Sequence, residues 1–179
     1  MATLISGSTG VNKIQDGTIT NADIASGAAI AGTKLVMPTG SVLQVVEYAY
    51  TGSTAMTSST YISMFGTSIT PSSTSSKILV MANVASMYMN HTAVAQHDWS
   101  ILRGTSTCTG ANTHFHTETG REQTGQGERF PLSMYILDEP STTNSVTYNV
   151  AAKRRSGNGN MWINDSSGTS TIVLMEIAG

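Results

Sequence analysis

The sequence predicts an all-β fold, and three observations support this prediction. First, Ser and Thr account for 49 of the 179 residues (23 Ser and 26 Thr), and Gly adds 17. Second, charged residues make up only 11% of the chain, against roughly 25% in an ordinary soluble domain. Third, segments rich in Val, Ile, Thr and Tyr, which favour strands, alternate with segments rich in Gly, Ser and Asn, which favour turns. No segment has a convincing helical period.

Eight segments after residue 40 predict strands, at intervals typical of a sandwich or a barrel. The strands are expected at 41–50, 60–70, 77–89, 98–104, 130–138, 144–153, 160–165 and 170–178. The third segment carries apolar residues on both faces near its start, so we expect that end to be buried between two layers. Together these segments predict a jelly-roll-like β-sandwich knob that spans residues 41–179.

The C-terminal part of the chain supplies three further expectations. The last strand segment, 170–178, has five large apolar residues and one charge, Glu176, so it should lie in the centre of a sheet or in an interface. The stretch 156–160, Ser-Gly-Asn-Gly-Asn, predicts a hairpin, because Asn-Gly tolerates the positive φ of primed turns. The basic run at 153–155 indicates protection of a strand edge rather than phosphate contacts.

Residues 1–40 differ from the rest of the chain. They carry four charges and no aromatic residue. Their large apolar residues recur every five or six positions, which fits neither a helix nor a strand; these are Ile14, Ile19, Ile24, Ile30 and Leu35. Such a segment cannot offset its ordering entropy alone. It is therefore either a disordered tail or an extended segment that becomes ordered by packing against copies of itself or a partner.

Charge and cysteine content exclude several classes of protein. A net charge of -2 and a pI near 6.0 argue against a non-specific nucleic-acid binder, which needs a basic face. Cys108 is the only cysteine, so neither an intrachain disulfide nor a multi-cysteine metal site is expected. The N-terminus lacks the pattern of a signal peptide, and no apolar run approaches the ~18 residues of a membrane span. We expect no Sec export, no membrane insertion and no nucleic-acid partner.

All four histidines lie between residues 90 and 129, and two of them form the only pattern with metal-binding logic. In an extended His114-Phe115-His116 segment, both imidazoles point to the same face. Three copies around a threefold axis would offer six imidazoles, a set suited to a transition metal. The other interpretation is a polar loop with two solvated histidines, because a lone pair lacks a third ligand. No other cofactor is expected.

Evidence for catalysis is weaker, and we expect no enzyme. The carboxylates nearest the histidines are Glu118, Glu122 and Glu128, with Asp98 beside His97. Their spacing in the sequence cannot establish the ~5–9.5 Å separation that a glycosidase needs, and no G-x-S-x-G elbow occurs. Trp99, Trp162 and Tyr148 could stack on a sugar, although aromatics in a β-sheet are more often part of the core.

Four segments together resemble tail-fibre and virion-appendage proteins of bacteriophages, especially those of marine podophages and cyanophages. They read VNKIQDGTITNADIASGAAIAGTKL, SITPSSTSSKILVMANVAS, YILDEPSTTNSVTYNVAAK and TSTIVLMEIAG. The resemblance runs over residues 10–89 and 130–179 and lapses between 90 and 129. The segments occur in the same order but are partly of low complexity, so their specificity is moderate.

This resemblance implies a homotrimer located in the virion and assembled in the cytoplasm of a bacterial host. Residues 1–40 would form a stalk or a virion anchor that contacts other virion proteins. In this stalk, three extended chains would wind about one axis, and the large apolar side chains of each chain would pack at that axis. The C-terminal part would be the knob. Because typical fibres are much longer, the short chain favours a short tail, neck or capsid appendage.

The segment where the resemblance lapses, 90–129, would be the variable surface that contacts the host. Loops on a rigid β scaffold can vary at little cost to folding. The partner would be a glycan or a protein of the host cell surface. The candidate contact residues are His91, His97, His114, Phe115, His116 and Arg121. The alternative functions are an architectural decoration or adaptor protein without host contact and, less favoured, a polysaccharide-degrading appendage.

Overall fold

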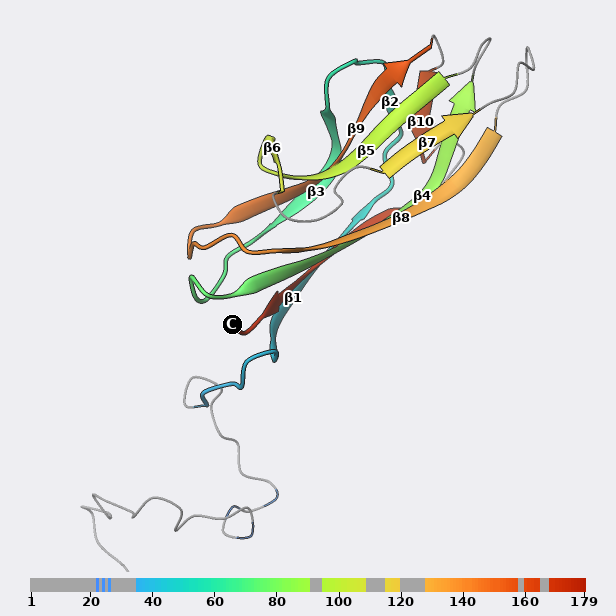
Figure 1. The fold of residues 1–179 in the computed structure, drawn as a ribbon. Coiled ribbons are helices and arrows are strands. Elements are labelled where there is room, and N and C mark those ends of the chain that lie inside the picture. Colours follow the sequence, from blue (N-terminus) through green and yellow to red (C-terminus); the bar gives the residue numbers. More distant parts are fainter. Residues whose placement is uncertain are drawn as a thin grey trace, which may run out of the picture. The chain divides into compact units, whose positions relative to one another are not determined.

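The computed structural model describes residues 22, 24, 26, 35–90, 95–108, 115–119, 128–157, 160–164 and 168–179. The chain divides into two units, Met1–Val36 and Met37–Gly179. In the first unit, Ile24, Leu35 and Val36 are all exposed in the single chain. The second unit is a β-sandwich (Figure 1). None of the described residues forms a helix long and apolar enough to span a membrane.

Two antiparallel sheets form the sandwich. Sheet A contains β1 (Val42–Tyr50), β2 (Thr54–Met56), β4 (Lys77–Asn90), β8 (Glu128–Asp138), β10 (Asn160–Ile163) and β11 (Ser170–Ile177). Sheet B contains β3 (Ile62–Ile69), β5 (Ala95–Arg103), β6 (Ser106–Thr107), β7 (Phe115–Thr119) and β9 (Val146–Ser156). The described part of the chain is thus all-β, as predicted.

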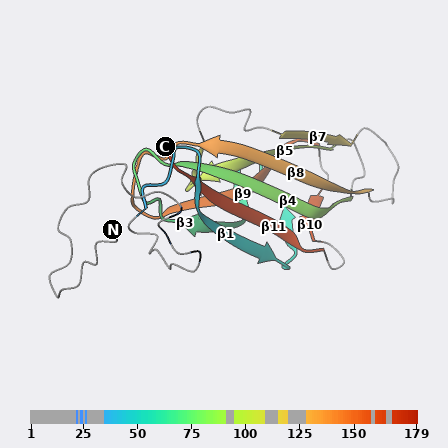
Figure 2. The same cartoon turned by 90° about the horizontal axis from the view of Figure 1, so that it is seen from below.

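The connectivity is that of a jelly roll. Eight strands form it, in the order β1-β11-β4-β8 in sheet A and β3-β9-β5-β7 in sheet B. Along the chain they alternate between the sheets, except that β5 and β7 are consecutive and pair with each other in sheet B. The first strand therefore lies beside the last, with Val46 opposite Leu174. The short strands β10 and β2 extend sheet A beside the far end of β4. Figure 2 shows β1, β11, β4 and β8 side by side.

The core lies between the sheets and follows from alternation along each strand. In the first part of β4, the buried residues are Ile78, Val80, Ala82 and Val84, as the period of two requires. After a register shift between Val84 and Met87, the buried residues are Met87 and Met89. Strand β11 alternates between buried and half-buried positions along its whole length. Sheet B contributes Trp99, Ile101, Tyr148 and Val150, all fully buried. Strand β11 lies between β1 and β4, which confirms the prediction that the last strand is central.

The structure differs from the sequence predictions in two respects. Strands β2, β6 and β7 were not expected, and β7 places 115–119 in sheet B. The hairpin predicted at 156–160 is wrong, because β9 and β10, on either side of it, belong to different sheets. Strand β9 lies between β3 and β5, but its pairing with β3 ends at Ala152, so the basic run at 153–155 pairs with β5 alone. There Lys153 and Arg155 lie within 3.5 and 3.8 Å of the Asp98 carboxylate.

Candidate functional site

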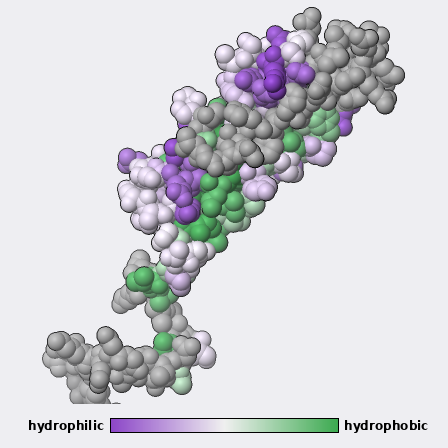
Figure 3. Space-filling model, viewed as in Figure 1, coloured by the Kyte–Doolittle hydropathy of each residue, from purple (hydrophilic) through white to green (hydrophobic). Residues whose placement is uncertain are grey.

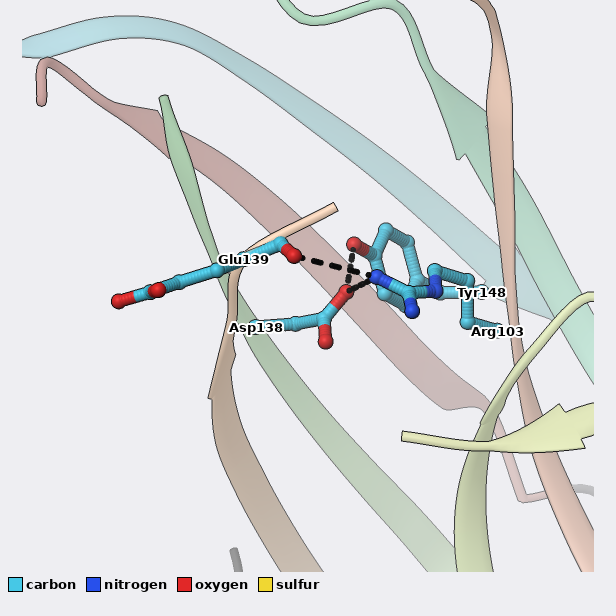
Figure 4. A network of polar contacts seen from close by, with 4 residues as sticks. All are labelled: Arg103, Asp138, Glu139 and Tyr148. Atoms are coloured by element: carbon cyan, nitrogen blue, oxygen red, sulfur yellow. Dashed lines mark hydrogen bonds and ion pairs between the residues drawn. The ribbon is translucent and has the colours of Figure 1, made fainter. Parts of the chain in front are cut away.

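A buried polar network joins the two sheets at one end of the sandwich (Figure 4). The Tyr148 hydroxyl donates a 2.6 Å hydrogen bond to Oδ2 of Asp138, and Nη1 of Arg103 lies 3.0 Å from the same oxygen. The Arg103 guanidinium also donates to the carbonyl of Glu139, at 3.3 Å. Burial, followed by this hydrogen bond, raises the pKa of Tyr148. The network fixes a phenol, a carboxylate and a guanidinium as permanent partners, so we assign it to the scaffold.

Cys108 lies near this network and is buried. Burial chiefly, and then the Asp138 carboxylate, raise the pKa of the Cys108 thiol to about 12. Because the thiolate is the form that attacks electrophiles and binds metals, a thiol with this pKa is inert near neutral pH. We therefore exclude Cys108 as a nucleophile.

A second buried carboxylate, Glu176, ties the last strand to the loop between β3 and β4. Its Oε1 accepts hydrogen bonds from the backbone N–H and hydroxyl of Ser72 and from the Ser76 hydroxyl, at 2.6–2.7 Å. Its Oε2 accepts one from Gln44 at 2.6 Å. Burial, the largest influence, would raise the pKa of Glu176, but these hydrogen bonds outweigh it and hold the pKa below its ordinary value. The Glu176 carboxylate therefore has a structural role, because it holds this loop against β11 and β1.

The contacts of Asp138 and Glu176 thus have structural roles. Asp98, one of the carboxylates considered above, is paired with two cations of β9. The described part of the chain contains no cluster of three or more His, Cys, Asp or Glu side chains that could hold a metal. The predicted metal pair lies largely outside that part: His114 is not among the described residues, and His116 is described only as a backbone position of β7 opposite Asp98.

The predicted host-contact residues fall into three groups. His91, His114 and Arg121 lie outside the described residues. Phe115 and His116 lie in β7, so the segment 90–129 contributes strands to sheet B and is not simply a loop. His97 is fully buried, because it shares the inward phase of Trp99 and Ile101 along β5. Its side chain is therefore not part of the surface of the single chain.

The three aromatic residues considered for sugar stacking differ in burial. Trp99 and Tyr148 are fully buried core residues, which is the commoner role of sheet aromatics. Trp162 is half-buried, and its neighbours Met161 and Ile163 point into the core. Its ring lies 5.7 Å from that of Tyr88, centroid to centroid, at an angle of 35°. The guanidinium carbon of Arg129 lies 4.4 Å from the Tyr88 ring centroid.

The most distinctive surface of the domain is the outward side of sheet A near the chain's entry and exit. Cross-strand pairing places apolar residues from four strands in two adjacent rows. We call these seven residues the apolar face: Val45, Met175, Leu79 and Leu137 in one row, and Val173, Met81 and Tyr135 in the next. Val45, Leu137 and Tyr135 are 55%, 51% and 73% exposed. Figure 3 shows hydrophobic colour gathered over the region of β1, β4 and β8.

Charges lie only at the margins of the apolar face. Glu47 ends the second row on β1, opposite Val173, and Lys77 lies at the start of β4, opposite Ile177. A row of small and polar residues follows: Ala49, Thr171, Asn83 and Ser133. Between this row and the second apolar row is an open hollow of about 260 Å³. The sequence signal for this face was the apolar residues on both sides of the segments 77–89 and 170–178.

Comparisons with known proteins identify no family for this chain. No protein-family model matches it, and no curated protein matches it either. The crystal structure of the infectious bursal disease virus VP2 subviral particle is similar with a TM-score of 0.38 and 16% identity, covering 85% of this chain and 37% of that chain. The infectious bursal disease virus Gt strain gives a TM-score of 0.34, 14% identity and coverage of 85% and 42%. Likenesses this weak carry no argument about function.

Proposed function

We propose that this chain is a virion structural protein that forms a short homotrimeric appendage, with its copies packed through the apolar face. The observation that carries this proposal is the apolar face itself. Seven outward side chains from four strands form a continuous surface without an internal charge, in a chain of which only 11% is charged. Contiguous apolar patches on soluble proteins mark interaction surfaces.

We take the partner on this surface to be a second copy of the chain. Four strands ~4.8 Å apart and about half the length of β1 give roughly 300 Å² of apolar face, which is the centre of an interface of ~800 Å² per partner. The charges at its margins, Glu47 and Lys77, have opposite signs. Copies arranged about an axis can therefore bring opposite charges together at the rim.

The remaining parts of the proposal rest on the resemblance to phage appendages. Residues 1–40 anchor the trimer to other virion proteins, with Ile14, Ile19, Ile24, Ile30 and Leu35 packing between copies. The knob contacts the host surface, and the protein acts by assembly and binding without catalysing a reaction. A cryo-EM map of the particle would test this assignment: knobs buried between other virion proteins would favour an architectural adaptor instead.

The homotrimer is tested by light scattering on the purified chain and two variants. The unchanged protein should have about three times the chain mass of 18.8 kDa. Leu137→Glu places a charge in the apolar face and should give monomers, while its circular dichroism stays β-rich because Leu137 is already half-exposed in the single chain. Thr147→Glu, at an exposed position of β9, is the matched control and should remain trimeric. A stable monomer of the unchanged chain would refute the proposal.

A further inference from the structure

The outward side of sheet A ends in a row of different chemistry, which we call the aromatic end. It consists of Trp162, Tyr88 and Arg129, which are cross-strand neighbours on β10, β4 and β8. Asn160 lies two residues before Trp162 and therefore faces the same way. The polar row at Asn83 separates this end from the apolar face. The aromatic end is thus a second surface, distinct from the proposed self-association surface.

The aromatic end lies far from the point where the chain enters the domain. Gly40 and Ala178 are hydrogen-bonded to each other at the entry end, where β1 begins and β11 stops. Strand β10 pairs with the last residues of β4, at the opposite end. Figures 1 and 2 both place β10 at the end of the sandwich away from the C-terminus. The aromatic end and the chain's entry at Gly40 therefore lie at opposite ends of the β-sandwich.

We propose that the aromatic end binds an acidic saccharide, with a sugar ring against Trp162 and an anionic substituent at Arg129. This proposal deepens the proposed host contact, and it rests on that function for the source of the sugar. The C–H face of a pyranose is apolar and carries slight positive charge, so it packs on the negative face of an aromatic ring. The hydroxyl groups at the rim of the sugar can bond to the side-chain amide of Asn160.

Arg129 gives the site its preference for acidic sugars. A guanidinium presents a planar fork of donors that matches a carboxylate. Here its carbon atom lies 4.4 Å from the Tyr88 ring centroid, and Tyr88 lies between Arg129 and Trp162 in the row. The site therefore combines a stacking surface and a held cation in one row across three strands.

A saccharide fits better than a single-stranded nucleic acid, which also uses aromatic stacking. Nucleic acids require a groove with several cations that follow the backbone phosphates. The six strands of sheet A contain only two Lys or Arg residues, Lys77 and Arg129. They lie at opposite ends of β4, since Arg129 pairs with Tyr88. One cation beside two rings is sufficient for one acidic sugar residue.

Binding is tested with a trisaccharide of galacturonic acid and, as the neutral counterpart, a trisaccharide of galactose. The chain has two tryptophans, and Trp99 is fully buried, so acrylamide quenching of fluorescence reports mainly on Trp162. The acidic trisaccharide should protect the fluorescence from quenching at millimolar concentration. In Trp162→Phe, the remaining signal from Trp99 should not respond to sugar.

Calorimetric titration of variants then assigns the roles. Trp162→Ala should weaken binding of the acidic trisaccharide about tenfold. Arg129→Gln should remove the preference over the neutral one, and Arg129→Lys should restore part of it, because an ammonium keeps the charge without the fork. The matched control is Tyr61→Ala, which removes an aromatic ring under Lys153 on the other sheet and should leave affinity unchanged. Circular dichroism verifies that each variant folds.

Three results would overturn the inference: no binding of either trisaccharide, equal losses in Trp162→Ala and Tyr61→Ala, or tighter binding of an oligo-dT probe than of the acidic sugar. Light scattering on the same samples separates this inference from the proposed function. If a monomer binds the sugar, the saccharide site is supported and the homotrimer is refuted. If the protein is a trimer and binds neither sugar, the homotrimer is supported and the saccharide site is refuted.

Discussion

The hydroxyl of Tyr148 in β9 donates a 2.6 Å hydrogen bond to the carboxylate of Asp138 at the end of β8, so one bond joins sheet B to sheet A. Asp138 is buried, and Arg103 of β5 supplies the cation that compensates its charge. Two strands of sheet B, β5 and β9, thus hold the end of β8 in sheet A. Arrangements of this kind specify how two sheets align, because a buried carboxylate without partners is costly.

Replacing Tyr148 by Phe should destabilise the domain by about 1–3 kcal/mol, because it removes a donor from a buried carboxylate and leaves the ring in place. Urea unfolding measures the change. Arg155→Met is the control: it removes an exposed cation that lies 3.8 Å from the Asp98 carboxylate, and exposed pairs contribute ~1 kcal/mol or less. Equal effects of the two substitutions would show that the Tyr148–Asp138 bond has no special role.

Glu176 should make stability depend on pH in the acid range. Its pKa in the folded state lies below the ordinary value of 4.5, so the folded state prefers the ionised form. The stabilisation is therefore fully present above the unfolded pKa and is lost as pH falls through the folded pKa. Urea midpoints should fall as pH decreases below 4.5, and Glu176→Gln should flatten this fall. Thr147→Gln, at an exposed position of β9, should leave the fall unchanged.

Cys108 should resist labelling in the folded protein. Its side chain is 5% exposed and its pKa is raised to about 12. A reagent therefore cannot reach the thiol, and the thiol is not in its reactive thiolate form. A thiol reagent such as iodoacetamide should react slowly at pH 8 and rapidly after addition of urea. Fast labelling without urea would place Cys108 outside the core.

Replacing Ile19, Ile24 and Ile30 together by Ser should separate the anchor from the knob. If these side chains pack between copies, each loss should remove about 1.5–3 kcal/mol of apolar burial, and the mass in light scattering or incorporation into particles should fall. The described core draws on residues from Val46 onward, so the urea midpoint of the knob should not change. Unchanged mass and unchanged incorporation would identify the segment as a passive tail.

The sequence alone determined the fold class and the position of most strands. Period-two alternation along 77–89, turn residues between apolar segments and the low charge content are local properties, and they predicted eight strands that the structure contains. The same alternation also predicts on which side of the sheet His97 and Trp162 lie. The phase set by Trp99 and Ile101 already places His97 inside, and the apolar neighbours of Trp162 place that ring outside.

Only the tertiary structure decided which residues meet. The row of Val45, Met175, Leu79 and Leu137 joins four strands that are far apart in the chain, and its register follows from non-local strand pairing. The same pairing brings Trp162 beside Tyr88 and Arg129. Glu176 is visible in the sequence as one charge in an apolar strand, and the same structure gave it partners in β1 and in the loop between β3 and β4. Local patterns set the face on which each side chain points, whereas the order of strands in the sheets sets its neighbours, because pairing is a property of the whole chain.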